Sequence, residues 1–176
     1  MAFSYTVPGL IVPVRTTWAD LWPALFTMMY SWKNQVSIPI EAAVATLGAD
    51  YLYHFQHPTF PTKVGGFAKS RLAAAAGMAV EPLVNRSIQV WLRLLMTHGP
   101  IWTIFRRAMT MRGKLGSSAG PELFVYGIAG DGTPSGTHIK YIDPHLGRFD
   151  TMRADDMTLE LGTDLTLVPH VLVWPV

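Results

Sequence analysis

Few residues of this chain could do acid–base or metal chemistry, and two of them lie in a proline-rich stretch before the middle of the sequence. His54 and His57 are three residues apart and could supply two metal ligands. A metal site needs at least a third ligand, and Asp50 is the only carboxylate close by in the sequence. We therefore interpret the pair as surface histidines, with a metal site as the alternative.

The second group of chemically capable residues lies in the last third of the chain. His138 alternates with the apolar Ile139, so we expect it on the solvated face of a strand. His145 follows Asp143 by two residues, a spacing typical of a local turn hydrogen bond. Its alternative role is that of a relocated catalytic base. Glu122 is a further acid that replaced active-site chemistry could use.

The composition of the chain narrows the class of protein. Its 176 residues are 49% hydrophobic and 15% charged, enough for one domain with a real core, in which two lobes would share a cleft. The net charge of +2 is too small to indicate nucleic acid as a partner. With no cysteine, the chain has no disulfide, thiolate metal ligand or thiol nucleophile, and nothing in it indicates a cofactor.

The N-terminal residues and the apolar runs indicate where in or outside the cell the protein is expected. The first 18 residues carry no basic n-region, and two prolines interrupt their apolar run, so they do not resemble a signal peptide. No apolar run reaches the length of a membrane span. We expect a soluble protein with no membrane partner, either cytoplasmic or exported by a route without a Sec signal peptide.

The spacing of apolar residues predicts helices first and strands second. The first helix would begin with Asp20 as its N-cap and the fourth with Ser87, while residues 51–66 are expected to be irregular. We predict an α+β fold, one domain over 1–176, with a helical half at about 20–98 and a β half at about 100–176. The predicted helices cover residues 20–32, 39–47, 67–76 and 87–96, and the predicted strands cover 101–105, 122–129, 137–142, 147–152 and 171–174.

The order of these segments resembles one known family. Residues 21–32, LWPALFTMMYSW, are similar to the Cys-Trp-Ala-Ala-…-Met-Leu-x-x-Trp opening of bacterial papain-like cysteine peptidases, the group with leader-peptide peptidases and secreted effector proteases. The GPIW of 99–102 is similar to the family's Gly-Pro-Leu-Trp strand start. Residues 121–144 resemble its His-bearing strand, glycine-rich hairpin and strand ending in Asp-Pro. The resemblance covers most of 10–150 and implies a papain-like fold.

The resemblance also shows which catalytic roles this chain has lost. The family uses a cysteine at a helix N-terminus, where the dipole helps to form the thiolate, a histidine base, an acid or amide that orients the histidine, and an upstream glutamine that stabilises the oxyanion. The matching positions are Leu21 for the nucleophile, Pro121 for the histidine and Arg15 for the glutamine. Asp143 alone keeps its role. The resemblance therefore implies a member that cannot act as a cysteine peptidase.

A basic segment near the middle of the chain suggests how such a protein could bind a partner. Arg106, Arg107, Arg112 and Lys114 lie within nine residues without an acid among them. The simpler interpretation is a solvated hairpin loop. The alternative is an electropositive lip over the former cleft that receives an acidic partner or phosphate.

Two tryptophans flank the former nucleophile position. Trp18 and Trp22 usually indicate core, but they could line a cleft that binds peptide. The leading hypothesis is an inactive papain-like protein that binds a protein or peptide. A small-molecule sensor or carrier is a further possibility. The alternative enzyme would be a hydrolase or transferase with replaced chemistry built on Asp143, His145, His138 or Glu122.

Overall fold

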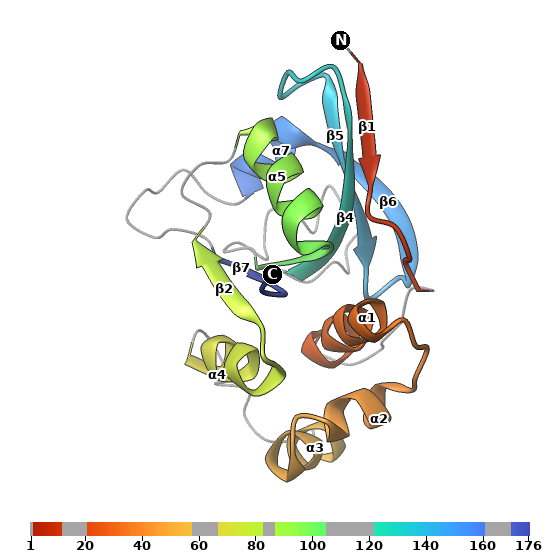
Figure 1. Ribbon diagram of the computed structural model, residues 1–176, viewed down its shortest axis with the longest axis vertical. Coiled ribbons are helices and arrows are strands. Elements are labelled where there is room, and N and C mark those ends of the chain that lie inside the picture. The colour runs from red at the N-terminus through yellow and green to blue at the C-terminus, as the bar shows by residue number, and fades with distance from the viewer. Residues whose placement is uncertain (1, 12–20, 58–66, 83–86, 105–121, 161–169) are drawn as a thin grey trace.

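The computed structural model describes residues 2–11, 21–57, 67–82, 87–104, 122–160 and 170–176 (Figure 1). Helices and strands alternate irregularly along the chain. In order they are β1 (Phe3–Thr6), α1 (Trp22–Asn34), α2 (Ile40–Ala45), α3 (Ala49–Gln56), α4 (Phe67–Ala76), β2 (Ala79–Pro82), α5 (Ile88–His98), β3 (Ile101–Ile104), β4 (Glu122–Gly130), β5 (Thr137–Asp143), β6 (Arg148–Arg153), α7 (Ala154–Glu160) and β7 (His170–Val173).

The strands form one seven-stranded sheet in the order β2-β7-β3-β4-β5-β6, with β1 pairing β4 off this path. All strand pairs of the described chain are antiparallel. This confirms the predicted α+β class. Two strands come from before residue 100: β1 pairs with the end of β4, and β2 pairs with β7. The sheet therefore depends on contacts between distant parts of the chain.

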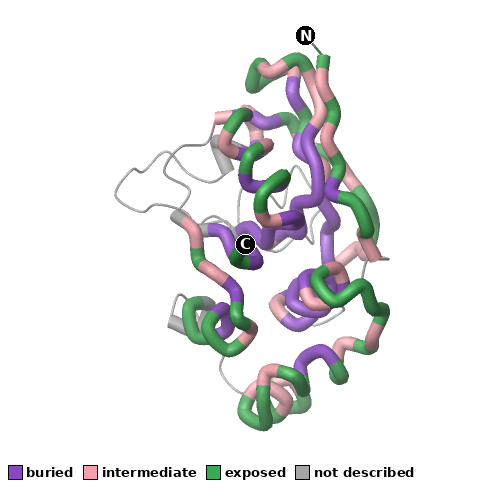
Figure 2. Tube along the Cα trace, in the orientation of Figure 1, coloured by how far each residue is buried: buried purple, intermediate pink, exposed green. Residues whose placement is uncertain are grey.

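Each face of the sheet carries its own core, because side chains alternate between the two faces of a strand. One core joins Trp91 and Leu95 of α5 to Tyr141 of β5 and Met157 of α7. The other joins α1 to Trp102 of β3 and to neighbouring strands. Helices α5 and α7 cover the first face, whereas α1 lies at one end of the second (Figure 1). Strand β4 is buried along most of its length, while β6 at the sheet edge is largely exposed (Figure 2).

Helices α5 and α1 begin in different ways, one with a side-chain cap and one without. Ser87 caps α5 as predicted, since its hydroxyl accepts from the Val90 N–H at 3.4 Å. The predicted N-cap Asp20 is wrong, because Leu21 takes that place and gives no side-chain cap. Pro23 lies in the first turn, where its missing N–H costs little. The start of α1 therefore depends on packing more than on a polar cap.

Residues 51–56 correct the predicted irregular stretch. They lie in helix α3, which begins after Gly48, and no residue of α3 is buried. The densely spaced histidines and the prolines farther on favoured a loop, but those prolines come after the helix. Strand β2 and helix α7 were not predicted either. None of the helices described is long and apolar enough to span a membrane.

Candidate functional site

The former nucleophile position begins a helix, as the resemblance predicts. Leu21 is the N-cap residue of α1, and its carbonyl accepts from the Leu25 N–H at 3.1 Å. Its side chain is 5% exposed and belongs to the core between α1 and the sheet. A leucine offers neither a nucleophile nor a proton, and here it fills space in the core. At this position the side chain therefore contributes to core packing.

Three of the positions that would surround Leu21 in the family lie outside the described residues. These are Arg15, Trp18 and Pro121. The same holds for the four residues of the basic lip, Arg106, Arg107, Arg112 and Lys114. The predicted pairing of Leu21 with Pro121 therefore stays a prediction. Glu122, the neighbour of Pro121, begins β4, which packs against α1.

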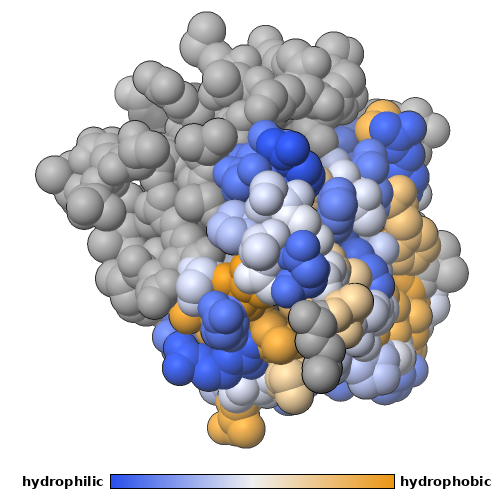
Figure 3. All heavy atoms as spheres, turned by 90° about the horizontal axis from the view of Figure 1, so that it is seen from above, coloured by the Kyte–Doolittle hydropathy of each residue, from blue (hydrophilic) through white to orange (hydrophobic). Residues whose placement is uncertain are grey.

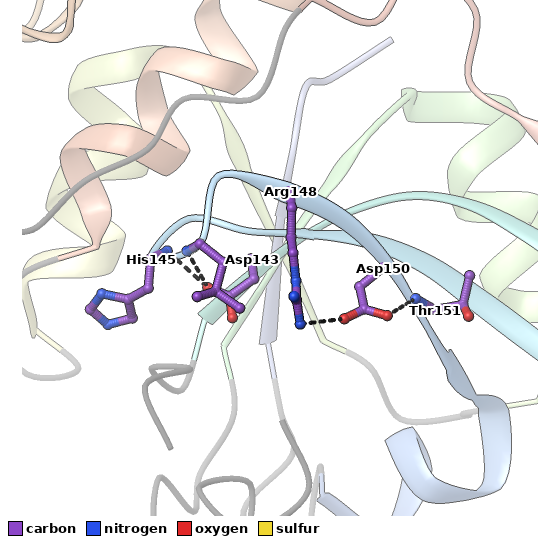
Figure 4. Close-up of polar contacts among 6 residues, drawn as sticks. Asp143, His145, Arg148, Asp150 and Thr151 are labelled. Atoms are coloured by element: carbon purple, nitrogen blue, oxygen red, sulfur yellow. Dashed lines mark hydrogen bonds and ion pairs between the residues drawn. The ribbon is translucent and has the colours of Figure 1, made fainter. Parts of the chain in front are cut away.

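Asp143, the acid that the resemblance assigns to the orienting role, takes part in a turn. It is 2% exposed at the end of β5, and its Oδ1 accepts from the backbone N–H of His145 at 2.8 Å and of Leu146 at 3.4 Å. The Gly147 N–H donates to its carbonyl at 2.8 Å. The ring of His145 points away from this carboxylate (Figure 4). The local turn hydrogen bond predicted for His145 is confirmed, and Asp143 does not orient its imidazole.

Glu122 lies on the other face of the sheet from Asp143. Its Oε2 accepts from the indole N–H of Trp102 at 2.9 Å, and Trp102 belongs to the α1 core. In β5, Ile142 belongs to the α1 core and Tyr141 to the α5 core, so Asp143 points to the α5 side. The two carboxylates are therefore not an acid–base pair.

His138 is also distant from Asp143. It lies near the other end of β5, is exposed, and pairs with Ala129 and Arg153 on neighbouring strands. Five residues of an antiparallel strand span about 17 Å. The solvated position predicted for His138 is confirmed. The four residues proposed for replaced chemistry therefore do not converge on one centre.

A polar cluster beside Asp143 was not foreseen from the sequence. Tyr141 is buried, and desolvation, together with the charges of Asp150 and Asp143, raises the pKa of its phenol well above the ordinary value of about 10. Arg148 pairs with Asp150 at 3.4 Å, and Asp150 also accepts from the Thr151 N–H at 2.8 Å (Figure 4). The phenol therefore stays protonated, and its role is structural. The sequence feature that could have indicated this cluster is the alternation of Arg148 and Asp150 along one strand.

The remaining predicted residues have ordinary partners. Trp22 is half-buried and meets Tyr51 of α3 edge-on, with ring centroids 6.1 Å apart. His57 stacks on Tyr53 at 4.2 Å, and its Nδ1 lies 3.0 Å from the Tyr53 carbonyl. His54 meets the same tyrosine ring edge-on. Within the described ranges, no three His, Asp or Glu side chains are grouped to hold a metal ion.

Comparison with known proteins identifies one family. A family model described as "papain-like cysteine protease AvrRpt2" matches residues 2–158, which is most of the chain. A search of curated proteins and a search of solved structures gave no match. The match spans both the helix that begins at Leu21 and the strands that carry Glu122 and Asp143.

Proposed function

This chain belongs to the family of the papain-like cysteine protease AvrRpt2, and we propose that it is a catalytically inactive member that binds a protein or peptide. The observation that carries the proposal is the absence of any cysteine from the whole sequence. The family's chemistry passes through a thiolate, and no other residue type supplies that nucleophile at neutral pH without a paired base.

The surroundings of the lost nucleophile support inactivity. Leu21 is buried in the α1 core, and its aliphatic side chain carries no group that could replace the thiol. Asp143 uses its carboxylate to hold two backbone N–H groups. Glu122 is bound to Trp102 on the opposite face. The polar groups that replaced chemistry would need are occupied and separated, which favours binding over catalysis.

The binding surface that we propose is the former cleft, with two sets of residues in different roles. The basic lip of Arg106, Arg107, Arg112 and Lys114 would attract an acidic partner and set the rate of association. Trp18 and Trp22 would supply apolar contact area and set the lifetime of the complex. Trp22 is half-buried, which leaves part of its ring for a partner.

A selection from a displayed peptide library on the immobilised protein tests this proposal. Selected peptides should bind and remain intact after long incubation. Charge reversal of the lip should slow association and flatten its salt dependence. Trp22→Ala should speed dissociation, provided that the variant melts like the wild type. Lys33→Glu, a charge reversal on an exposed lysine of α1, is the matched control and should change neither rate.

Two outcomes would overturn the proposal. One is binding that is insensitive to both the lip and the tryptophans, which would mean that the former cleft is not the working surface. The other is peptide turnover that disappears in His145→Ala or His138→Ala. That result would transfer the function to the replaced-chemistry enzyme.

A further inference from the structure

Among the described residues, no helix covers one face of the sheet over strands β1, β5 and β6. Helices α5 and α7 cover the opposite face, and α1 covers only one end of this one (Figure 1). We call this the open face and define it by Ser4, Thr6, Lys140 and Phe149. None of these residues belongs to the set proposed to line the former cleft, so a binding role for the open face goes beyond the proposed function and can fail without it.

Lys140 is fixed at the centre of the open face. Its Nζ donates to the Thr6 hydroxyl at 2.8 Å and to the Ser4 hydroxyl at 3.3 Å, both on β1. Strand β4 lies between Lys140 on β5 and its partners on β1, because Lys140 pairs with Gly127 and Gly127 pairs with Thr6. The lysine therefore reaches across one strand, over about 10 Å of sheet, to find its partners.

Gly127 makes this crossing possible. A Cβ at that position would meet Lys140 Cδ at 3.0 Å and the Tyr5 carbonyl oxygen at 2.8 Å. The aliphatic part of Lys140 thus lies over the bare backbone of Gly127. The ladder between β4 and β5 also shifts register between Val125 and Gly127, which marks a bulge at this place. Two hydrogen bonds and this packing position the ammonium group over β1.

The contacts of Lys140 leave its charge unbalanced. Its partners are neutral hydroxyls, and no carboxylate of the described residues forms an ion pair with it. Arg153 on the same face differs, because it is paired with Asp155 at 3.0 Å and with Asp156 at 3.4 Å. The hydroxyls of Ser4 and Thr6 accept from Lys140 and keep their own protons to donate. One cation and two O–H donors therefore lie together, where a single anion could meet all three.

An exposed aromatic ring lies at the edge of the same face. Phe149 is 52% exposed, and its ring meets that of Tyr126 edge-on with centroids 5.3 Å apart. Phe149 pairs with Ile142, two residues from Lys140 on β5. The backbones of Lys140 and Phe149 are thus diagonal neighbours, but the Lys140 ammonium lies over β1, three strand spacings from β6, which is about 14 Å across the sheet. From the end of the molecule that carries the N-terminus, hydrophilic and hydrophobic residues intermix over the coloured part of the surface (Figure 3).

We propose that the open face binds an extended acidic peptide segment in which an apolar side chain and a carboxylate are four residues apart. Side chains four apart on an extended chain point to the same side and are about 14 Å apart. That spacing matches the distance across the sheet from Phe149 on β6 to the Lys140 ammonium over β1. The apolar side chain lies on Phe149, and the carboxylate binds the Lys140 ammonium and the Ser4 and Thr6 hydroxyls.

Two capped peptides test the proposal, identical except for Glu or Gln four residues after a phenylalanine. Each is titrated into isotope-labelled protein while the backbone amide signals of Ser4, Thr6, Lys140 and Phe149 are followed. The Glu peptide should shift these signals and bind about fivefold more tightly than the Gln peptide. Lys140→Met keeps the aliphatic stem and should make the two affinities equal. Phe149→Thr should weaken both peptides, by about tenfold.

Matched controls separate this surface from the former cleft. Lys33→Met removes an exposed lysine of α1 and should preserve the fivefold difference. Charge reversal of the basic lip should preserve it as well, so the two proposals fail separately. Equal affinities for the wild type, or a difference that survives Lys140→Met, would overturn the inference. So would inorganic phosphate that saturates these signals while the Glu peptide leaves them unmoved.

Discussion

Replacing Leu21 by alanine measures whether the former nucleophile position has become part of the core. The side chain is 5% exposed, and the change removes three buried carbon atoms. At about 0.8 kcal/mol for each buried carbon, the lost transfer free energy is about 2.5 kcal/mol. The cavity left between α1 and the sheet adds to this value. We expect Leu21→Ala to lower the free energy of unfolding by about 3 kcal/mol.

Urea denaturation, followed by tryptophan fluorescence and far-UV circular dichroism, measures this loss. The midpoint should fall with an unchanged slope, and thermal unfolding should shift by about 6–12 °C for a chain of this size. Met96→Ala is the control, because Met96 is 62% exposed on α5 and should cost less than about 0.5 kcal/mol. A loss for Leu21→Ala as small as that of the control would refute the reasoning, because Leu21 would then face an open groove.

Three further changes have defined outcomes. Gly127→Ala should lower the free energy of unfolding by about 1–3 kcal/mol in the same assay, because its Cβ would meet the Tyr5 carbonyl oxygen at 2.8 Å. An unchanged midpoint would contradict the close approach of Tyr5 and the Lys140 side chain to Gly127. The raised pKa of Tyr141 means that the unfolded state loses its phenol proton first, so stability should fall as pH rises above about 10, and Tyr141→Phe should reduce that fall in denaturation curves at pH 9 and 11. Leu21→Cys combined with Pro121→His and Arg15→Gln should fold but hydrolyse peptides poorly or not at all, because catalytic groups must be held to about half an ångström by supporting residues; robust hydrolysis would show that the scaffold is intact.

Local signals in the sequence predicted the elements that local interactions specify. Ser87 stands before an apolar repeat, and α5 begins there through its side-chain cap. Strand β4 is a nearly continuous apolar run and β5 begins with polar–apolar alternation, and turn residues join them, so their existence was predictable. Asp143 and His145 are two residues apart, and their turn hydrogen bond was expected for the same reason.

Long-range pairing explains most of what the sequence did not reveal. Strand β2 is four residues long and gains its partner, β7, from about ninety residues further along the chain. Lys140 and Thr6 are 134 positions apart, so no spacing rule could join them. The start of α1 at Leu21 lacks the polar cap that sequence patterns depend on. The candidate site was found through its resemblance to a family, and the missing cysteine could be recognised directly because it is a matter of residue type.

The central claim is that this papain-like protein binds without catalysis. The most direct measurement incubates the purified wild-type protein with a diverse peptide library and analyses both the bound and the free peptides by mass spectrometry. The account predicts a bound fraction enriched in acidic peptides, all of them intact, and no new termini in the free fraction. New termini that accumulate with time in the wild type, and that vanish in Asp143→Asn or His145→Ala, would contradict it.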